Sequence, residues 1–207
     1  MLKINSILTP LGFRNFVVAL FVIVISAYMG YRFWTTRDIA WRWEEEVQLA
    51  DGGRIMVKRK QETEMKGGGE PFTNPRGPKS GRITIMDGSN DVEWESALFP
   101  MIVERGLKPG QWVIIASPIF CQDHYKYGSP KPPYIQFEYT NGHWVNRHVD
   151  PKWYGRRSNL LMAYEKFEMF DGKSITAEEI RKFNNPVYKV PQRYLFVDAK
   201  RKSNCYR

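Results

Sequence analysis

Residues that commonly carry chemistry are scarce in this 207-residue chain, which has two cysteines and three histidines. Two cysteines, Cys121 and Cys205, are too few for a disulfide framework, although they can pair with each other in an oxidising compartment. Cys205 falls in residues 201–207, which we expect to form a loose C-terminal tail. The cysteine count therefore leaves the redox compartment open.

Histidine is equally sparse, and four residues form the candidate set of zinc ligands. They are Cys121, His124, His143 and His148, with the spacing C-x2-H and H-x4-H. His143 and His148 are five residues apart on one predicted strand, so their side chains point to opposite faces of the sheet. One zinc ion cannot take both without a bulge, and we predict no metal site.

The stretch FCQDHY (residues 120–125) holds the residue types of thiol catalysis, namely Cys121, Asp123 and His124. Neighbours in sequence rarely adopt the geometry of a catalytic set. No helix start is predicted here that would lower the pKa of the thiol. We therefore expect Cys121 to be a small buried hydrophobic residue and His124 to lie in a loop.

Positive charge is in excess, with 31 Lys and Arg against 22 Asp and Glu and a formal net charge of +9. Such a surplus favours anionic surfaces, either lipid headgroups or nucleic acid. Basic and aromatic residues interleave in HYKYGSPKPPY (124–134) and PKWYGRR (151–157), as a stacking platform for bases would require. The charge is nevertheless spread along the chain, which is typical of a soluble surface. We do not expect nucleic acid to be a partner.

The segment NFVVALFVIVISAYMGY (15–31) has no charged residue and lies between Arg14 and Arg32. Seventeen helical residues span about 25 Å, slightly less than the ~30 Å hydrocarbon core of a bilayer. The flanking arginines and a cluster of aromatic residues at one end can supply the difference. This composition favours a membrane span.

Two alternatives compete with a span. A soluble core helix would carry a polar face, and no polar residue occurs between Phe16 and Ile25. A signal peptide would be cut most readily after Ala27, but this cut places a bulky isoleucine at position −3. We predict an uncleaved transmembrane helix over 15–34, after a short leader (1–14), with lipid of the inner (plasma) membrane as its partner. Basic residues are nearly balanced on its two sides, and we expect the domain in the periplasm rather than in the cytoplasm.

For residues 40–200, the sequence pattern predicts a β-rich soluble domain. In AWRWEEEVQLADGGRIMVKRK (40–60), alternating residues flank the turn Asp51-Gly52-Gly53, which predicts a hairpin. Glu45 falls on the apolar face of the first strand. As a general acid or base it would need a raised pKa and a partner. Pairing with a nearby basic residue is the more common arrangement for such a carboxylate.

Residues 61–81 are rich in glycine and proline and predict a mobile loop between strands. This loop cannot be a phosphate-binding loop of the P-loop type. That motif needs lysine directly after its second glycine, whereas Pro78 separates Gly77 from Lys79. No cofactor is predicted.

Further strands are predicted over 82–86, 91–99 and 111–120, the last buried on both faces. The segment YIQFEYTNGHWVNRHV (134–149) contains Asn141-Gly142, the pair that a type I′ turn favours because both positions need positive φ. This turn pairs Tyr139 with Trp144 and places both on the core face with Ile135 and Phe137.

Two short helices are predicted near the C-terminus. In SITAEEIRKFNNP (174–186), Thr176 and Glu179 have the spacing of a capping box, and Ile175 and Ile180 that of a hydrophobic staple. A second helix is predicted within 154–170. Such short helices usually pack on a sheet.

Two stretches, WRWEEEVQLADGGRIMVKR (41–59) and YGSPKPPYIQFEYTNGHWVNR (127–147), resemble a family of proteobacterial membrane-anchored proteins of unknown function. Members of that family have a short N-terminal hydrophobic segment followed by two hairpins of this kind. The resemblance covers about a quarter of the chain. It implies a Gram-negative bacterial envelope and transfers no functional residue.

The sequence therefore predicts a mainly β protein with minor α. Its parts are an N-terminal transmembrane helix, an antiparallel sheet or sandwich-like domain, and two short C-terminal helices. The expected function is an accessory or interaction role at a membrane, with a protein of the envelope as a further partner and no assigned catalytic residue. Two alternatives stay open: a membrane-tethered hydrolase that uses Glu45, Asp123 or His124, and a basic module that binds anionic lipid or nucleic acid.

Overall fold

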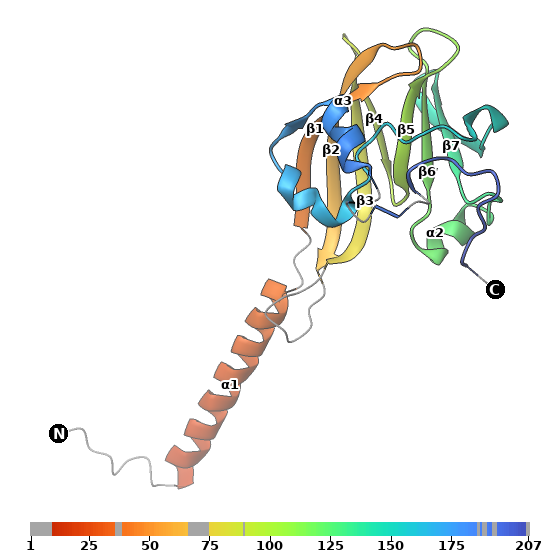
Figure 1. Cartoon of the computed structure of the whole chain (residues 1–207). Helices are drawn as coiled ribbons and strands as arrows, with labels where there is room; N and C mark the ends of the chain where they lie inside the picture. The colour runs from red at the N-terminus through yellow and green to blue at the C-terminus, as the bar shows by residue number, and fades with distance from the viewer. Residues whose placement is uncertain are drawn as a thin grey trace. The chain divides into compact units, whose positions relative to one another are not determined.

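The structure is a computed structural model that describes residues 10–35, 39–65, 75–88, 90–185, 187, 190–191 and 194–205 (Figure 1). The chain divides into two compact units, residues 1–39 with 64–76 and residues 40–63 with 77–207. The first unit contains the N-terminal helix, and the second is a β domain.

Helix α1, Pro10–Thr35, contains the apolar stretch of the sequence. Its 19 residues Phe13–Tyr31 are long and apolar enough to cross a membrane, because a helix of this length measures about 28 Å. Large apolar side chains on it are exposed, for example Phe21 at 67% and Ile23 at 64%. The predicted segment 15–34 is entirely helical. Of the predicted leader, residues 10–14 also belong to α1, and residues 1–9 lie outside the described residues.

The β domain is built from two sheets, as expected. Strand order in the first is β4-β3-β2-β1-β9, and in the second β5-β6-β7-β8. The first sheet comprises β1 (Ile39–Gln48), β2 (Arg54–Met65), β3 (Pro75–Met86), β4 (Val92–Ser96) and β9 (Ser174–Ile175). The second comprises β5 (Phe99–Arg105), β6 (Trp112–Ser117), β7 (Ile135–Thr140) and β8 (His143–His148). Strand β9 lies parallel to β1, and all three pairs of the second sheet are antiparallel.

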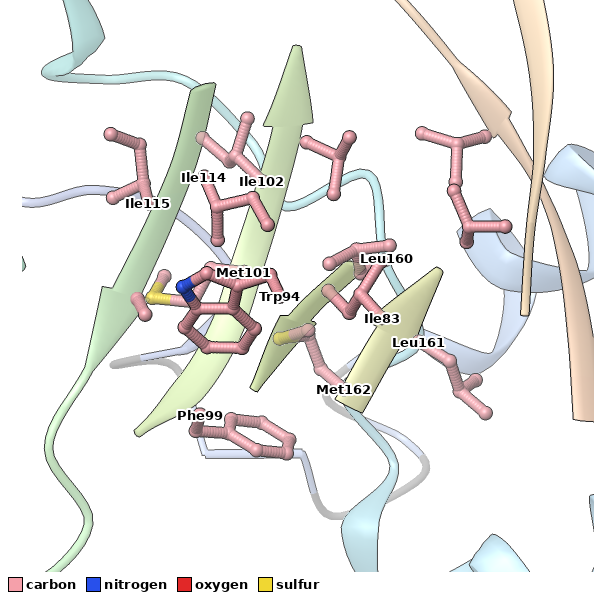
Figure 2. Close-up of a cluster of buried hydrophobic side chains, with 14 of the residues drawn as sticks. Ile83, Trp94, Phe99, Met101, Ile102, Ile114, Ile115, Leu160, Leu161 and Met162 are labelled. Atoms are coloured by element: carbon pink, nitrogen blue, oxygen red, sulfur yellow. The ribbon is translucent and has the colours of Figure 1, made fainter. Parts of the chain in front are cut away.

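Side chains from both sheets form one hydrophobic core (Figure 2). Trp94 of β4 contacts Phe137 of β7 edge to face, with ring centroids 5.3 Å apart, and so joins the two sheets. The segment Leu160-Leu161-Met162 is fully buried in the same core. Burial of each such side chain contributes roughly 1.5–3 kcal/mol, which makes this core the main source of stability.

Alternation along β1 follows the predicted pattern. Trp43, Glu45, Val47 and Leu49 are buried, and the residues between them are not. Strand β6 is buried at every position, which confirms the prediction of a strand covered on both faces.

The β7–β8 hairpin has the predicted register, with Tyr139 opposite Trp144. Both turn residues have positive φ, 51° at Asn141 and 83° at Gly142. The indole of Trp144 donates a hydrogen bond of 2.6 Å to the backbone carbonyl of Glu93 in β4. This bond links the outer strands of the two sheets.

The prediction of a loop over 61–81 is wrong at both ends, because β2 and β3 extend into this range. Residues 66–74 lie outside the described residues. These extensions contain polar residues together with proline and glycine. Gln61 is buried, and its amide donates a 2.6 Å hydrogen bond to the carbonyl of Ser80 on the neighbouring strand. A side chain at Gly81 would approach the Gln61 amide oxygen to 3.2 Å, so a glycine that resembles a loop residue permits close strand packing.

Two further predictions need correction. The strand predicted over 91–99 is divided between the sheets, since β4 ends at Ser96 and β5 begins at Phe99. Within 154–170 the only helix among the described residues is the 3-10 helix Tyr164–Phe170. Leu160 and Leu161 precede it and donate their backbone N–H groups to Met101 and Glu45. These long-range bonds replace the intrahelical ones.

Helix α3, Ala177–Phe183, has the predicted capping box. The Thr176 hydroxyl accepts a bond from the Glu179 N–H at 3.3 Å, and the Glu179 carboxylate accepts one from the Thr176 N–H at 2.9 Å. Ile175 and Ile180 are both buried, at 3% and 2% exposure. The first short helix of the domain, α2 (Cys121–Lys126), was not predicted.

Candidate functional site

Glu45, the first of the candidate catalytic residues, lies fully buried beneath the first sheet. One carboxylate oxygen accepts bonds from the Trp43 indole at 2.5 Å and the Arg59 guanidinium at 3.1 Å, and the other accepts from the Leu161 N–H at 3.1 Å. Arg59 is itself buried, and burial lowers its pKa against the opposing effect of Glu45. The guanidinium also lies 5.2 Å from the centre of the Trp43 ring. Each of these interactions holds core segments together, which is a structural role.

The other two hydrolase candidates, Asp123 and His124, lie on α2, and His124 is buried rather than in a loop. Burial raises the pKa of Asp123 and lowers that of His124, the latter with a contribution from Lys131. Within the described residues, no hydrogen bond joins Glu45, Asp123 and His124 to one another. The three do not form a catalytic set.

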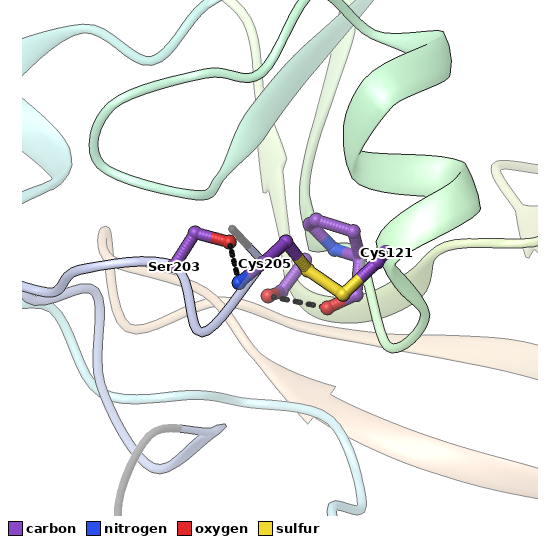
Figure 3. The surroundings of a disulfide bond; sticks show 5 residues. Cys121, Ser203 and Cys205 are labelled. Atoms are coloured by element: carbon purple, nitrogen blue, oxygen red, sulfur yellow. Dashed lines mark hydrogen bonds between the residues drawn. A yellow bond between two sulfur atoms is a disulfide. The ribbon is translucent and has the colours of Figure 1, made fainter. Parts of the chain in front are cut away.

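Cys121 begins α2 and forms a disulfide with Cys205, 84 residues away, with the two Cα atoms 5.3 Å apart (Figure 3). It is exposed, so its prediction as a buried hydrophobic residue is wrong. The bond ties the C-terminal tail to the domain. Arg201 of this tail also donates to the Ser117 hydroxyl at 3.0 Å and lies over the rings of Tyr134 and Tyr194. The described part of the tail, residues 201–205, is therefore attached to the domain.

The zinc candidates are distributed over two elements. His143 and His148 are exposed on β8, and the sulfur of Cys121 is bonded to Cys205. Among the described residues, no group of three or more His, Cys, Asp or Glu side chains is placed to hold a metal ion.

The basic and aromatic run 151–157 contributes to two adjoining hollows of the β domain. The first, here called the Trp153 hollow, has a volume of about 400 Å³. Its basic side chains each have a carboxylate partner: Arg105 with Asp51, Arg147 with Glu138, Lys152 with Asp150 and Arg156 with Glu104. Trp153 is only 4% exposed and lies beneath Lys152 and Arg156. The ring is covered, so it offers no free face for stacking a base.

The second hollow, here called the Arg157 hollow, adjoins the first at Arg156 and has a volume of about 530 Å³. Arg157 and Arg181 also line it, and no Asp or Glu is among its described lining residues. Its apolar lining is Leu49, Ala177, Ile180, Leu195 and Phe196. Two further arginines, Arg157 and Arg181, together with apolar side chains suit an anion that has an apolar part, whereas Arg156 is already paired with Glu104.

Side-chain amides hold the wall of the Arg157 hollow in place. Asn159 donates to the carbonyls of Gln48 and Val103 and accepts from the Val103 N–H. Asn184 accepts from the Met162 N–H at 2.7 Å and donates to the Leu160 carbonyl at 2.6 Å. These hydrogen bonds fix the two amides to the backbone, and the arginines supply the charged donors of the hollow.

Sequence reasoning identified Arg156 and Arg157 within a basic run but did not connect them with Arg181. The only local signal was α3 itself, whose capping box fixes where the helix begins. No pattern in the sequence indicated that this helix packs beside residues 156–159.

Comparison of the chain with protein-family models, with curated proteins and with solved structures gives no match.

Proposed function

We propose that this protein is a membrane-anchored accessory protein of a bacterial envelope, and that its β domain works by binding on the oxidising side of the inner membrane. The observation that carries this proposal is the disulfide Cys121–Cys205 in a chain that also has the apolar helix Phe13–Tyr31. Disulfides persist in oxidising compartments and are rare in the cytosol. The envelope setting follows from the resemblance of the two hairpins to bacterial membrane-anchored proteins.

A binding role is favoured over hydrolysis because Glu45 is engaged in the core and shares no hydrogen bond with Asp123 or His124 among the described residues. A hydrolase that uses Glu45, Asp123 or His124 needs two of them within reach of one substrate. Glu45 is instead bonded to Arg59, Trp43 and Leu161 in the core. A carboxylate that is fully buried and fully bonded has no access to a substrate.

Two measurements test the anchor and the compartment. Membranes of cells that express the chain are washed with alkaline carbonate, and the full-length chain should remain in the pellet. For sidedness, Cys205→Ser leaves Cys121 as the single, exposed thiol of the chain. A membrane-impermeant maleimide should label this variant in intact spheroplasts and should leave the wild type unlabelled unless a reductant is added.

The double variant Cys121→Ser/Cys205→Ser is the matched control, because it has no thiol. Recovery of the full-length chain in the carbonate supernatant would contradict the anchor, as would a mature amino terminus beyond Ala27. Labelling of the Cys205→Ser variant only after permeabilisation would place the domain in the cytoplasm and contradict the proposed side.

A further inference from the structure

The two adjoining hollows differ in whether their cations are already neutralised. In the Trp153 hollow every basic side chain has a carboxylate within 4 Å, at 3.0–3.7 Å. In the Arg157 hollow, the backbone of Arg157 pairs with that of Phe196 in a β-bridge, and the Arg157 side chain forms no hydrogen bond or ion pair with any residue that the structure describes. Arg181 reaches Glu178 only at 3.8 Å, with both side chains more than 60% exposed. Such an exposed pair contributes little, so positive charge remains at this hollow.

The charged side chains among the described lining residues of the Arg157 hollow are all arginines, which are donors only. Arg156 gives one N–H to Glu104 and pairs with no second carboxylate among the described residues. The guanidinium groups of Arg157 and Arg181 add further forked donors. Arginine forks match the two oxygens of a phosphate or a carboxylate, whereas they reject cations and bind neutral groups weakly.

The apolar part of the lining is contributed by buried and half-buried side chains. Ile180 is 2% exposed and Leu49 4%, so both are part of the core, and the half-buried Leu195 offers more accessible apolar surface. Phe196, at 37% exposure, lies at the outer part of the lining. A volume of about 530 Å³ falls within the size of small-molecule sites.

From this combination we propose that the Arg157 hollow is a binding site for an amphiphilic anion, in which an alkyl phosphate group contacts Arg157 and Arg181 and its apolar body covers Leu195 and Phe196. Two kinds of ligand have this combination of a phosphate and an apolar part. They are the headgroup region of an anionic phospholipid and a soluble organic phosphate. The site does not depend on the anchor or the disulfide, so failure of the carbonate or labelling test would leave it intact.

The test is calorimetric titration of the full-length chain in an uncharged detergent with three probes. Hexyl phosphate carries both the charge and the apolar chain of the proposed ligand. Inorganic phosphate carries the charge alone, and hexanol carries the apolar chain alone. Hexyl phosphate should bind at least about tenfold more tightly than inorganic phosphate, since each buried methylene adds to affinity. Hexanol should show no saturable binding.

Variants then assign the site. Arg157→Ala and Arg181→Ala should each weaken hexyl phosphate binding about tenfold, the effect expected for loss of a charge-assisted hydrogen bond. Phe196→Ser should reduce the preference for hexyl phosphate over inorganic phosphate. The matched control is Arg147→Ala in the Trp153 hollow, an equally exposed arginine that should leave the affinity unchanged. All four side chains are exposed, and an unchanged urea midpoint would show that each variant is folded.

Nanodiscs distinguish the two sources. If phospholipid headgroups occupy the hollow, hexyl phosphate should bind the chain more weakly in phosphatidylglycerol discs than in phosphatidylcholine discs, and Arg157→Ala should abolish the difference. Equal affinity in both discs would assign a soluble ligand to the same site. Absence of saturable hexyl phosphate binding would overturn the proposal, and so would equal losses in Arg157→Ala and Arg147→Ala.

Discussion

Replacement of Glu45 by alanine should lower the free energy of unfolding by about 3–5 kcal/mol, the loss expected when one member of a buried ion pair is removed. Arg59, 2% exposed, would then be a buried charge without a carboxylate partner. The buried donors of Trp43 and Leu161 would lose their acceptor as well, each at a cost of roughly 1–3 kcal/mol. Typical domains have only about 5–15 kcal/mol of stability, so this change removes a large part of it.

The assay is urea unfolding of the full-length chain in an uncharged detergent, followed by the fluorescence of its seven tryptophans. A lower midpoint with an unchanged m value would report lost stability without a change in the unfolded state. Glu95→Ala is the control, because its ion pair with Arg82 is exposed on the first sheet. This control should lie within about 1 kcal/mol of the wild type.

A double variant separates the cost of the unpaired Arg59 charge from the cost of the lost hydrogen bonds. Glu45→Leu/Arg59→Met removes both charges and should be more stable than Glu45→Ala, since an apolar pair avoids the desolvation cost of an unpaired ion. A loss below about 1 kcal/mol in Glu45→Ala would refute the structural role and return Glu45 to the candidate catalytic residues. A double variant less stable than Glu45→Ala would refute the argument from the uncompensated charge.

Three further predictions use the same unfolding assay. Thr176→Ala should cost about 1 kcal/mol by removing the N-cap of α3; an unchanged midpoint would mean that the cap does not contribute. Burial lowers the pKa of His124, so the unfolded chain takes up this proton at higher pH, and stability should fall as the pH drops below about 6.5. His124→Gln should reduce this fall between pH 7.5 and 5.5, and an identical fall in the variant would contradict the assignment. Cys205→Ser opens a loop of 84 residues and should cost roughly 2–5 kcal/mol, whereas reductant should destabilise the wild type but not this variant.

Local features of the fold were predictable because their physics is contained within a few residues. Asn141-Gly142 favours positive φ through its own local preference, and that turn fixes which residues of β7 and β8 face each other. The capping box at Thr176 is likewise complete within one helical turn. The errors occurred where distant partners override local preference. Leu160 and Leu161 have the apolar pattern of a helix, but their N–H groups bond to Met101 and to Glu45.

The candidate site was predictable only in part. The run 151–157 was identified as basic and aromatic, but burial of Trp153 beneath its neighbouring cations depends on how the chain covers the second sheet. That Arg181 lines the same hollow as Arg157 depends on where α3 packs. Neither contact has a signal in nearby residues.

The amino-acid sequence by itself determined the apolar helix Phe13–Tyr31, the strand alternation and the turn chemistry, since length, periodicity and φ preferences act over short stretches of chain. Only the tertiary structure decided that Cys121 meets Cys205, that Glu45 is neutralised by Arg59, and that three arginines share one hollow. Each of these depends on closing long loops around a common core. Such closure is governed by the packing of all the elements together, and no short segment of sequence contains that information.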